Sequence, residues 1–147
     1  MLTVIVNLAL STMLTQTPPA NFACSVLTTA QVTSLIGAAK TLPMLNAPNG
    51  ATCMFQNNDK IITVLTSTNG SAEAAQRLYE GKKRIAAGAD VAGWAVPAYS
   101  AVMKGVAVSG VLKQQTFVEI KVSDKTQKPD AMVQKLQAAM KDFAGRK

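Results

Sequence analysis

The sequence predicts an α+β domain, with an antiparallel sheet of about five strands and helices packed on one face, in the order α-β-β-α-β-β-β-α. Apolar residues recur at helical spacing in three separate segments. Short strand-like runs are joined by polar turns, and in one of them apolar and charged residues alternate, as in an antiparallel strand with one wet face. A chain of 147 residues has room for one domain with an ample core.

The first helix is expected over 27–37. Thr28 and Gln31 have the spacing of a capping box, and Gly37 stands where a helix C-cap would fall. The apolar residues expected on its buried face are Val32, Leu35 and Ile36. The segment 40–50 contains prolines and an Asn-Gly pair, which interrupt both regular periods and therefore predict a loop.

A β-hairpin is predicted next, from two strand-like segments at 51–56 and 61–67. The polar turn 57–60 that joins them has a length that links antiparallel neighbours. Cys53 is then expected on the first strand of the hairpin.

A second helix is predicted from Ser71, which can cap it, to about residue 87. Its apolar residues gather on one side, whereas the basic triplet Lys82, Lys83 and Arg84 lies largely elsewhere. The triplet and the net charge of +7 predict a solvated basic face, because charge runs on helices are usually exposed. A polyanion or membrane-surface site is the alternative.

Three further strands are predicted at 98–103, 106–112 and 116–122. In the last of them, apolar residues alternate with Glu119 and Lys121, which are expected on its solvated face. The residues that predict the C-terminal helix are Pro129 in its first turn and then Val133, Leu136, Met140 and Phe143 at helical spacing.

The chain has no histidine, which removes most common catalytic and metal-site chemistry. Ser-His-Asp and Cys-His arrangements cannot form, and two cysteines alone cannot complete a structural zinc site. The eight acidic residues fall mostly in predicted turns and on predicted exposed helix faces, so no pair is expected to do acid–base chemistry. We therefore predict that the protein is not an enzyme and uses no metal or other cofactor.

Cys24 and Cys53 are expected to form a disulfide, because the apolar stretch at the start of the chain indicates export to an oxidising compartment. Residues 1–23 are predicted to be a signal-peptide-like or disordered segment, and residues 24–147 a single domain of a secreted or periplasmic protein. The apolar opening is shorter than the ~20 residues that span a bilayer, and it lacks a positive n-region. An ordinary strand or helix packed on the domain is the alternative.

A lipid anchor on Cys24 is a further possibility for an exported chain. The three residues before it lack the leucine and small residue of a lipoprotein signal, and lipidation would leave Cys53 as an unpaired thiol. A disulfide is therefore preferred. Ala20 and Ala23 are candidate cleavage-zone residues.

Trp94, Tyr99 and Tyr79 are the candidate ligand or partner contacts. Trp94 lies in the loop 93–97, and a lone aromatic side chain on a loop can anchor a partner because it buries much area at small entropic cost. For Trp94 a core plug over the sheet edge is the preferred interpretation. Nucleic acid is not expected, since the strands offer few aromatic side chains and no interleaved arginines.

The residues that carry a resemblance to a known family are Cys24, Leu27, Thr28, Gly37, Gly50, Cys53, Phe55, the segment 91–93, Ala98 and Tyr99. Over roughly 24–143 the chain resembles small exported bacterial domains, often lipoproteins, that look like variants of a PsbP-like α+β sandwich and whose molecular function is largely uncharacterised. The resemblance implies a paired Cys24 and Cys53. Trp94 and Pro97 depart from it, because the family usually has an aliphatic residue and a Gly-Asp type of turn there, and the upstream lipobox is missing.

Two functions from different classes are expected. The first is a non-enzymatic exported domain that binds an envelope component, protein or lipid-like, through the sheet face or the Trp94 loop. The second is a secreted inhibitor or polyanion-binding structural module that uses the basic triplet and the basic C-terminal helix. Polyanion binding should weaken steeply with ionic strength, whereas apolar anchoring should not.

Overall fold

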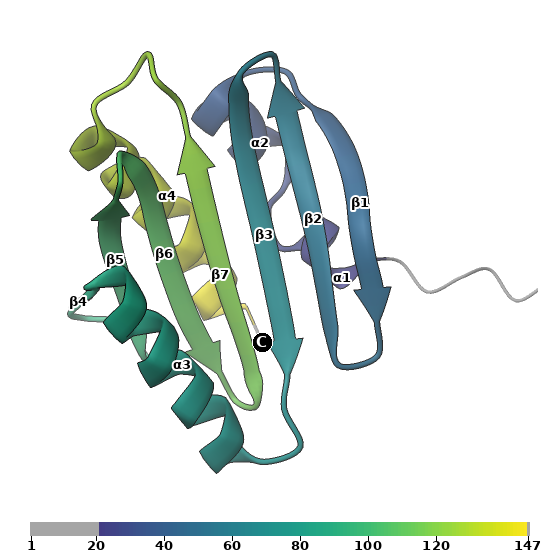
Figure 1. Ribbon diagram of the computed structural model, residues 1–147, viewed down its shortest axis with the longest axis vertical. Helices are drawn as coiled ribbons and strands as arrows, with labels where there is room; N and C mark the ends of the chain where they lie inside the picture. Colours follow the sequence, from purple (N-terminus) through teal and green to yellow (C-terminus); the bar gives the residue numbers. More distant parts are fainter. Residues whose placement is uncertain (1–20, 147) are drawn as a thin grey trace, which may run out of the picture.

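The computed structural model describes residues 21–146, which form a seven-stranded antiparallel sheet and four helices. The strand order across the sheet is β1-β2-β3-β7-β6-β5-β4 (Figure 1). The elements in chain order are α1 (Phe22–Ser25), α2 (Thr29–Ile36), β1 (Lys40–Ala47), β2 (Gly50–Asn57), β3 (Lys60–Thr68), α3 (Ala72–Ala86), β4 (Ala89–Asp90), β5 (Ala98–Met103), β6 (Val106–Lys113), β7 (Thr116–Ser123) and α4 (Pro129–Gly145). The predicted α+β class and antiparallel sheet are confirmed.

The helices whose start is marked by a capping residue or a first-turn proline form where the sequence predicts them. The Thr28 side chain accepts a hydrogen bond from the Gln31 backbone at 3.2 Å, and the Gln31 side chain accepts one from the Thr28 backbone at 2.8 Å. Ser71 caps α3 through the backbone N–H of Ala74, and Pro129 occupies the first turn of α4. These caps satisfy backbone donors that a helix cannot satisfy itself, so they fix where α2 and α3 begin.

The sheet has two more strands than predicted, and both are edge strands. β1 replaces the loop expected at 40–50 and pairs antiparallel with β2, with an irregularity in register between Pro43 and Leu45. An edge strand tolerates proline because one side of its backbone needs no partner in the sheet. At the opposite edge, the two-residue β4 pairs with β5. A further difference is the short helix α1, which precedes the predicted first helix.

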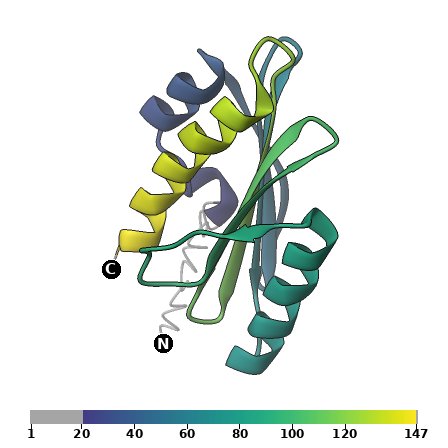
Figure 2. The same cartoon turned by 90° about the vertical axis from the view of Figure 1, so that its left-hand side faces the viewer.

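Helices cover both faces of the sheet, so the prediction that they pack on one face is wrong. Figure 2 shows α1, α2 and α4 on one side of the sheet and α3 alone on the other. The main core lies on the three-helix side, where Ile62, Ile120 and Leu136 are fully buried. A second core lies beneath α3 and contains Tyr79 and Phe117. β6 and β7, which have α4 on one face and α3 on the other, are therefore buried on both faces.

Candidate functional site

The side chains beneath α3 include one buried carboxylate. Tyr99 on β5, Gly110 on β6 and Glu119 on β7 are aligned in register across three adjacent strands. Because Gly110 has no side chain, the ring of Tyr99 lies over β6, and its hydroxyl donates a 2.6 Å hydrogen bond to Oε2 of Glu119. Lys121 Nζ lies 3.3 Å from Oε1 of the same carboxylate.

The alternation of Glu119 with apolar residues predicts that it lies on a solvated face. This prediction is wrong, because Glu119 is only 4% exposed. Both of its oxygens have partners, so the carboxylate is paired in the way that a buried charge requires. Burial, together with the hydrogen bond to Glu119, raises the pKa of Tyr99 far above its ordinary value, and the phenol stays protonated. The cluster links β5 to β7 across β6 and holds its carboxylate in an ion pair.

Tyr79 joins Tyr99 in this second core, as part of α3. Its ring packs edge-on against Tyr99 with centroids 5.5 Å apart and against Phe117 at 6.3 Å. Burial and the nearby charge of Asp90 raise the pKa of Tyr79 to about 12. Its hydroxyl is buried and has no hydrogen-bond partner among residues 21–146.

Trp94 is not brought together with the two tyrosines. It is half-buried against the main core on the opposite side of the sheet, beside the C-terminal part of α4. A hollow of about 130 Å³ there is lined by Trp94, Lys141 and Ala144 among others. The three predicted contact residues therefore divide between two faces.

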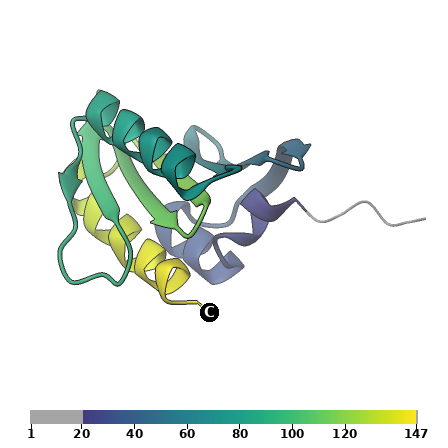
Figure 3. The same cartoon turned by 90° about the horizontal axis from the view of Figure 1, so that it is seen from below.

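An uncovered apolar surface lies next to α3, and sequence reasoning did not single it out. Because α3 packs mainly on β5, β6 and β7, the same face of β1–β3 has no helix over it within the described chain (Figure 3). We call this surface the open face; the residues that form it are Leu42, Leu45, Thr52, Met54, Thr63 and Leu65. Leu42 and Leu45 are 36% and 55% exposed, and the other four are half-buried.

A groove runs where the open face meets α3. It holds about 280 Å³, and its lining includes Leu45, Thr52, Leu65 and Ser67 from the sheet and Leu78 and Lys82 from α3. Leucines from three elements thus form an apolar trough with a lysine beside it. This groove and the open face together are the candidate functional site.

The basic triplet does not form one patch. Lys82 lines the groove, Lys83 donates a 2.6 Å hydrogen bond to the Asp90 carboxylate, and Arg84 is exposed. The partnership with Asp90 raises the pKa of Lys83 and engages its charge within the protein. Only Lys82 of the three lies in the candidate site.

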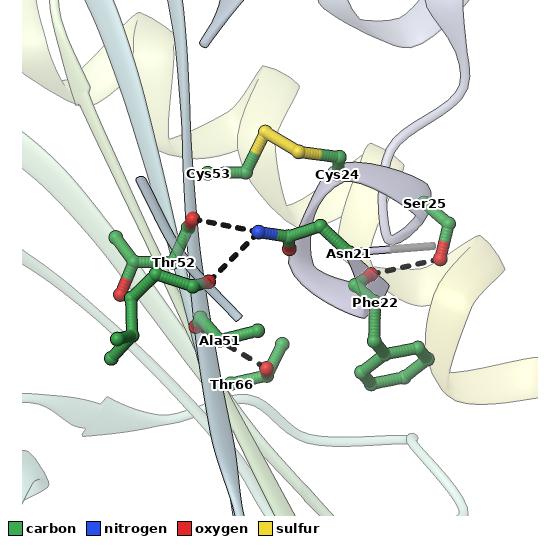
Figure 4. The surroundings of a disulfide bond; sticks show 9 residues. Asn21, Phe22, Cys24, Ser25, Ala51, Thr52, Cys53 and Thr66 are labelled. Atoms are coloured by element: carbon green, nitrogen blue, oxygen red, sulfur yellow. Dashed lines mark hydrogen bonds between the residues drawn. A yellow bond between two sulfur atoms is a disulfide. The ribbon is translucent and has the colours of Figure 1, made fainter. Parts of the chain in front are cut away.

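The predicted disulfide between Cys24 and Cys53 is confirmed, with their Cα atoms 5.1 Å apart (Figure 4). It ties α1 to β2 on the main-core face. Next to it, the side-chain amide of Asn21 donates hydrogen bonds to the backbone oxygens of Leu45 at 2.8 Å and Thr52 at 3.2 Å. A disulfide is consistent with an oxidising compartment.

The described residues contain neither a membrane-spanning helix nor a metal-binding cluster. None of the helices between residues 21 and 146 has the length and apolar content that crossing a bilayer requires. In the same part of the chain, no three side chains of the types His, Cys, Asp and Glu gather closely enough to hold a metal ion.

Comparisons with known proteins add no assignment. No protein-family profile, no curated protein and no solved structure matches the chain. The resemblance to small exported domains therefore stays a prediction.

Proposed function

We propose that this protein is an exported, non-enzymatic binding domain that holds another component of the cell envelope, protein or lipid-like, on its open face. One observation carries the proposal: beside α3, half of a sheet face has no helix over it within residues 21–146 and leaves Leu42 and Leu45 exposed. Contiguous apolar surface is costly to leave in water and commonly marks an interaction site. The groove beside Leu78 gives this surface a concave edge.

The same arrangement supports a role without catalysis. Glu119 is the buried carboxylate nearest the groove, and its oxygens are already engaged by Tyr99 and Lys121. A general base must be free to reach a substrate proton, and the sequence supplies no histidine for that task. The basic triplet supports a polyanion-binding role less well, because its members diverge.

The disulfide supports export, and it also limits which lipid modification Cys24 can carry. Residues 1–20, which include the apolar opening of the predicted signal-like segment, lie outside the described residues. The sulfur of Cys24 is bonded to Cys53, so a disulfide-bonded molecule cannot carry a thioether-linked lipid at Cys24. We therefore place the exported protein in the periplasm or outside the cell without an anchor at that residue.

We expect the N-terminus of the exported protein to lie at or before Asn21. The Asn21 amide holds backbone oxygens of both β1 and β2, and Ala23 is fully buried in the main core. Cleavage after Ala23 would remove both contributions, whereas cleavage after Ala20 would keep them. Intact-mass measurement of protein recovered from the envelope or medium checks this, and a chain that starts at Cys24 would contradict it.

Site-specific photo-crosslinking tests the binding face. A photoreactive residue placed at Leu45 on the open face should give a discrete adduct in cells that export the protein. The matched control is Val102, an aliphatic strand residue of β5 that is 42% exposed, compared with 55% for Leu45. No adduct from position 45, or the same adducts from both positions, would refute binding at the open face.

A further inference from the structure

The two faces of the sheet differ in how many helices they carry. On the disulfide side, α1 and α2 pack over β1–β3, while α4 packs over β5–β7 and contacts α2. On the other side, α3 covers only the β5–β7 half, which leaves the open face beside it. Three strands spaced ~4.8 Å apart make a strip about as wide as an α-helix of ~10 Å diameter. The open face is therefore about as wide as one α-helix.

The floor of this strip mixes aliphatic side chains with threonines, Thr52 and Thr63, and is apolar mainly in its two central rows. Leu45 lies opposite Thr52, which lies opposite Leu65, and in the next row Leu42 lies opposite Met54. Leu78 of α3 forms the side wall. An amphipathic helix buries a stripe of this kind with apolar residues spaced three and four apart.

The charges around the strip are cationic. Among the described residues that β1, β2, β3 and β7 present to this side, the charged ones are Lys40, Lys121 and Glu119, and the last two form an ion pair with each other. Lys82 adds a second cation, from α3, on the opposite side of the strip from Lys40. A partner that carried carboxylates at its edges would meet opposite charge on both sides of the strip.

The shape of the groove favours a helix over a small amphiphile. Small-molecule sites enclose their ligand and bury most of its surface, whereas this groove of about 280 Å³ is open and lies beside a flat face. A helix needs a long shallow face and no deep pocket. The shape therefore favours a protein segment over a lipid.

We propose that an acidic amphipathic helix of a partner protein docks on the open face beside α3. Its apolar stripe packs on Leu45, Leu65 and Leu78, and its carboxylates face Lys40 and Lys82. This inference rests on the proposed function and names the partner that the same surface recognises.

Two synthetic helical peptides of about 18 residues, long enough to span an eight-residue strand, test the proposal against the full chain. They share one leucine stripe and an alanine-rich remainder, and only the positions that flank the stripe are glutamate in one peptide and lysine in the other. By fluorescence anisotropy at low salt, the glutamate peptide should bind about tenfold more tightly. Lys82→Glu should remove most of this preference, and so should high salt.

The matched control is Lys141→Glu, which makes the same charge change at an exposed position of α4 on the opposite face. It should leave the preference unchanged. Equal affinity of the two peptides, or an equal effect of both substitutions, would overturn the acidic helix. If position 45 still crosslinks to an envelope component in that case, the binding face stands and only the partner is wrong; if it gives no adduct, both proposals fail.

Discussion

Replacing Gly110 by alanine should lower the free energy of unfolding by about 2–6 kcal/mol. A Cβ at this position would lie 2.2 Å from Cε1 of Tyr99 and 2.4 Å from its Cζ, so the ring must leave its place over β6. Its hydroxyl would then lose Glu119, and a buried carboxylate would lose one of its partners. Urea unfolding followed by far-UV circular dichroism measures the change.

Gly81→Ala is the control for Gly110→Ala. Gly81 lies within α3, and a Cβ there would meet no atom within 4 Å. Alanine is the better helix former, so this variant should gain up to ~1 kcal/mol. If both variants unfolded at the same urea concentration, the ring of Tyr99 could not be packed against Gly110 as described.

Removing the disulfide with Cys24→Ala and Cys53→Ala together should cost about 3–4 kcal/mol of stability. The crosslink joins residues 29 positions apart and limits the freedom of the unfolded chain. Cys53 is also fully buried in the main core, so the variant loses some packing as well. The difference in unfolding free energy between the oxidised protein and this variant gives the size of the effect.

Reduction of the natural protein provides an independent check on the same bond. With excess thiol reductant, the natural protein should approach the stability of the double variant, and the double variant should not change. An unreduced sample whose two thiols both react with an alkylating reagent would show that the bond is absent, and the predicted loss would then have no basis.

Elements with a local signal were predictable from the sequence. The capping box of α2, the Ser71 cap of α3 and Pro129 at the start of α4 each act within one helical turn. The hairpin of β2 and β3 follows in the same way from one short polar turn. The disulfide was predictable because two cysteines allow one pairing.

β1 was not predictable by the same signals. Its residues are almost all exposed, and Pro43 lies in the middle of it, so neither periodicity nor composition distinguishes it from a loop. What makes it a strand is its pairing with β2, together with the Asn21 amide that reaches the backbone of Leu45. These contacts depend on residues distant in sequence.

The burial of Glu119 also depends on long-range packing. Alternation along β7 correctly separates its two faces, but it does not reveal whether a helix covers the polar one. One usable signal was the uncharged run 106–112, because a strand without any charged residue indicates burial on both faces. The open face gave no signal, since half-buried Thr and Met are common on any sheet surface.

The irregular edge formed by β1 has a consequence for how this protein behaves when it is concentrated. Pro43 lacks the amide hydrogen that a neighbouring molecule would need, and the shift in register beside it disturbs the spacing of the remaining donors. At the far edge, β4 pairs only with Tyr99 and Ser100, so residues 101–103 of β5 stand at the edge of the sheet. The β1 edge is thereby a poor template for pairing with a second molecule, so edge-to-edge association under crowding should involve β5 in preference to β1.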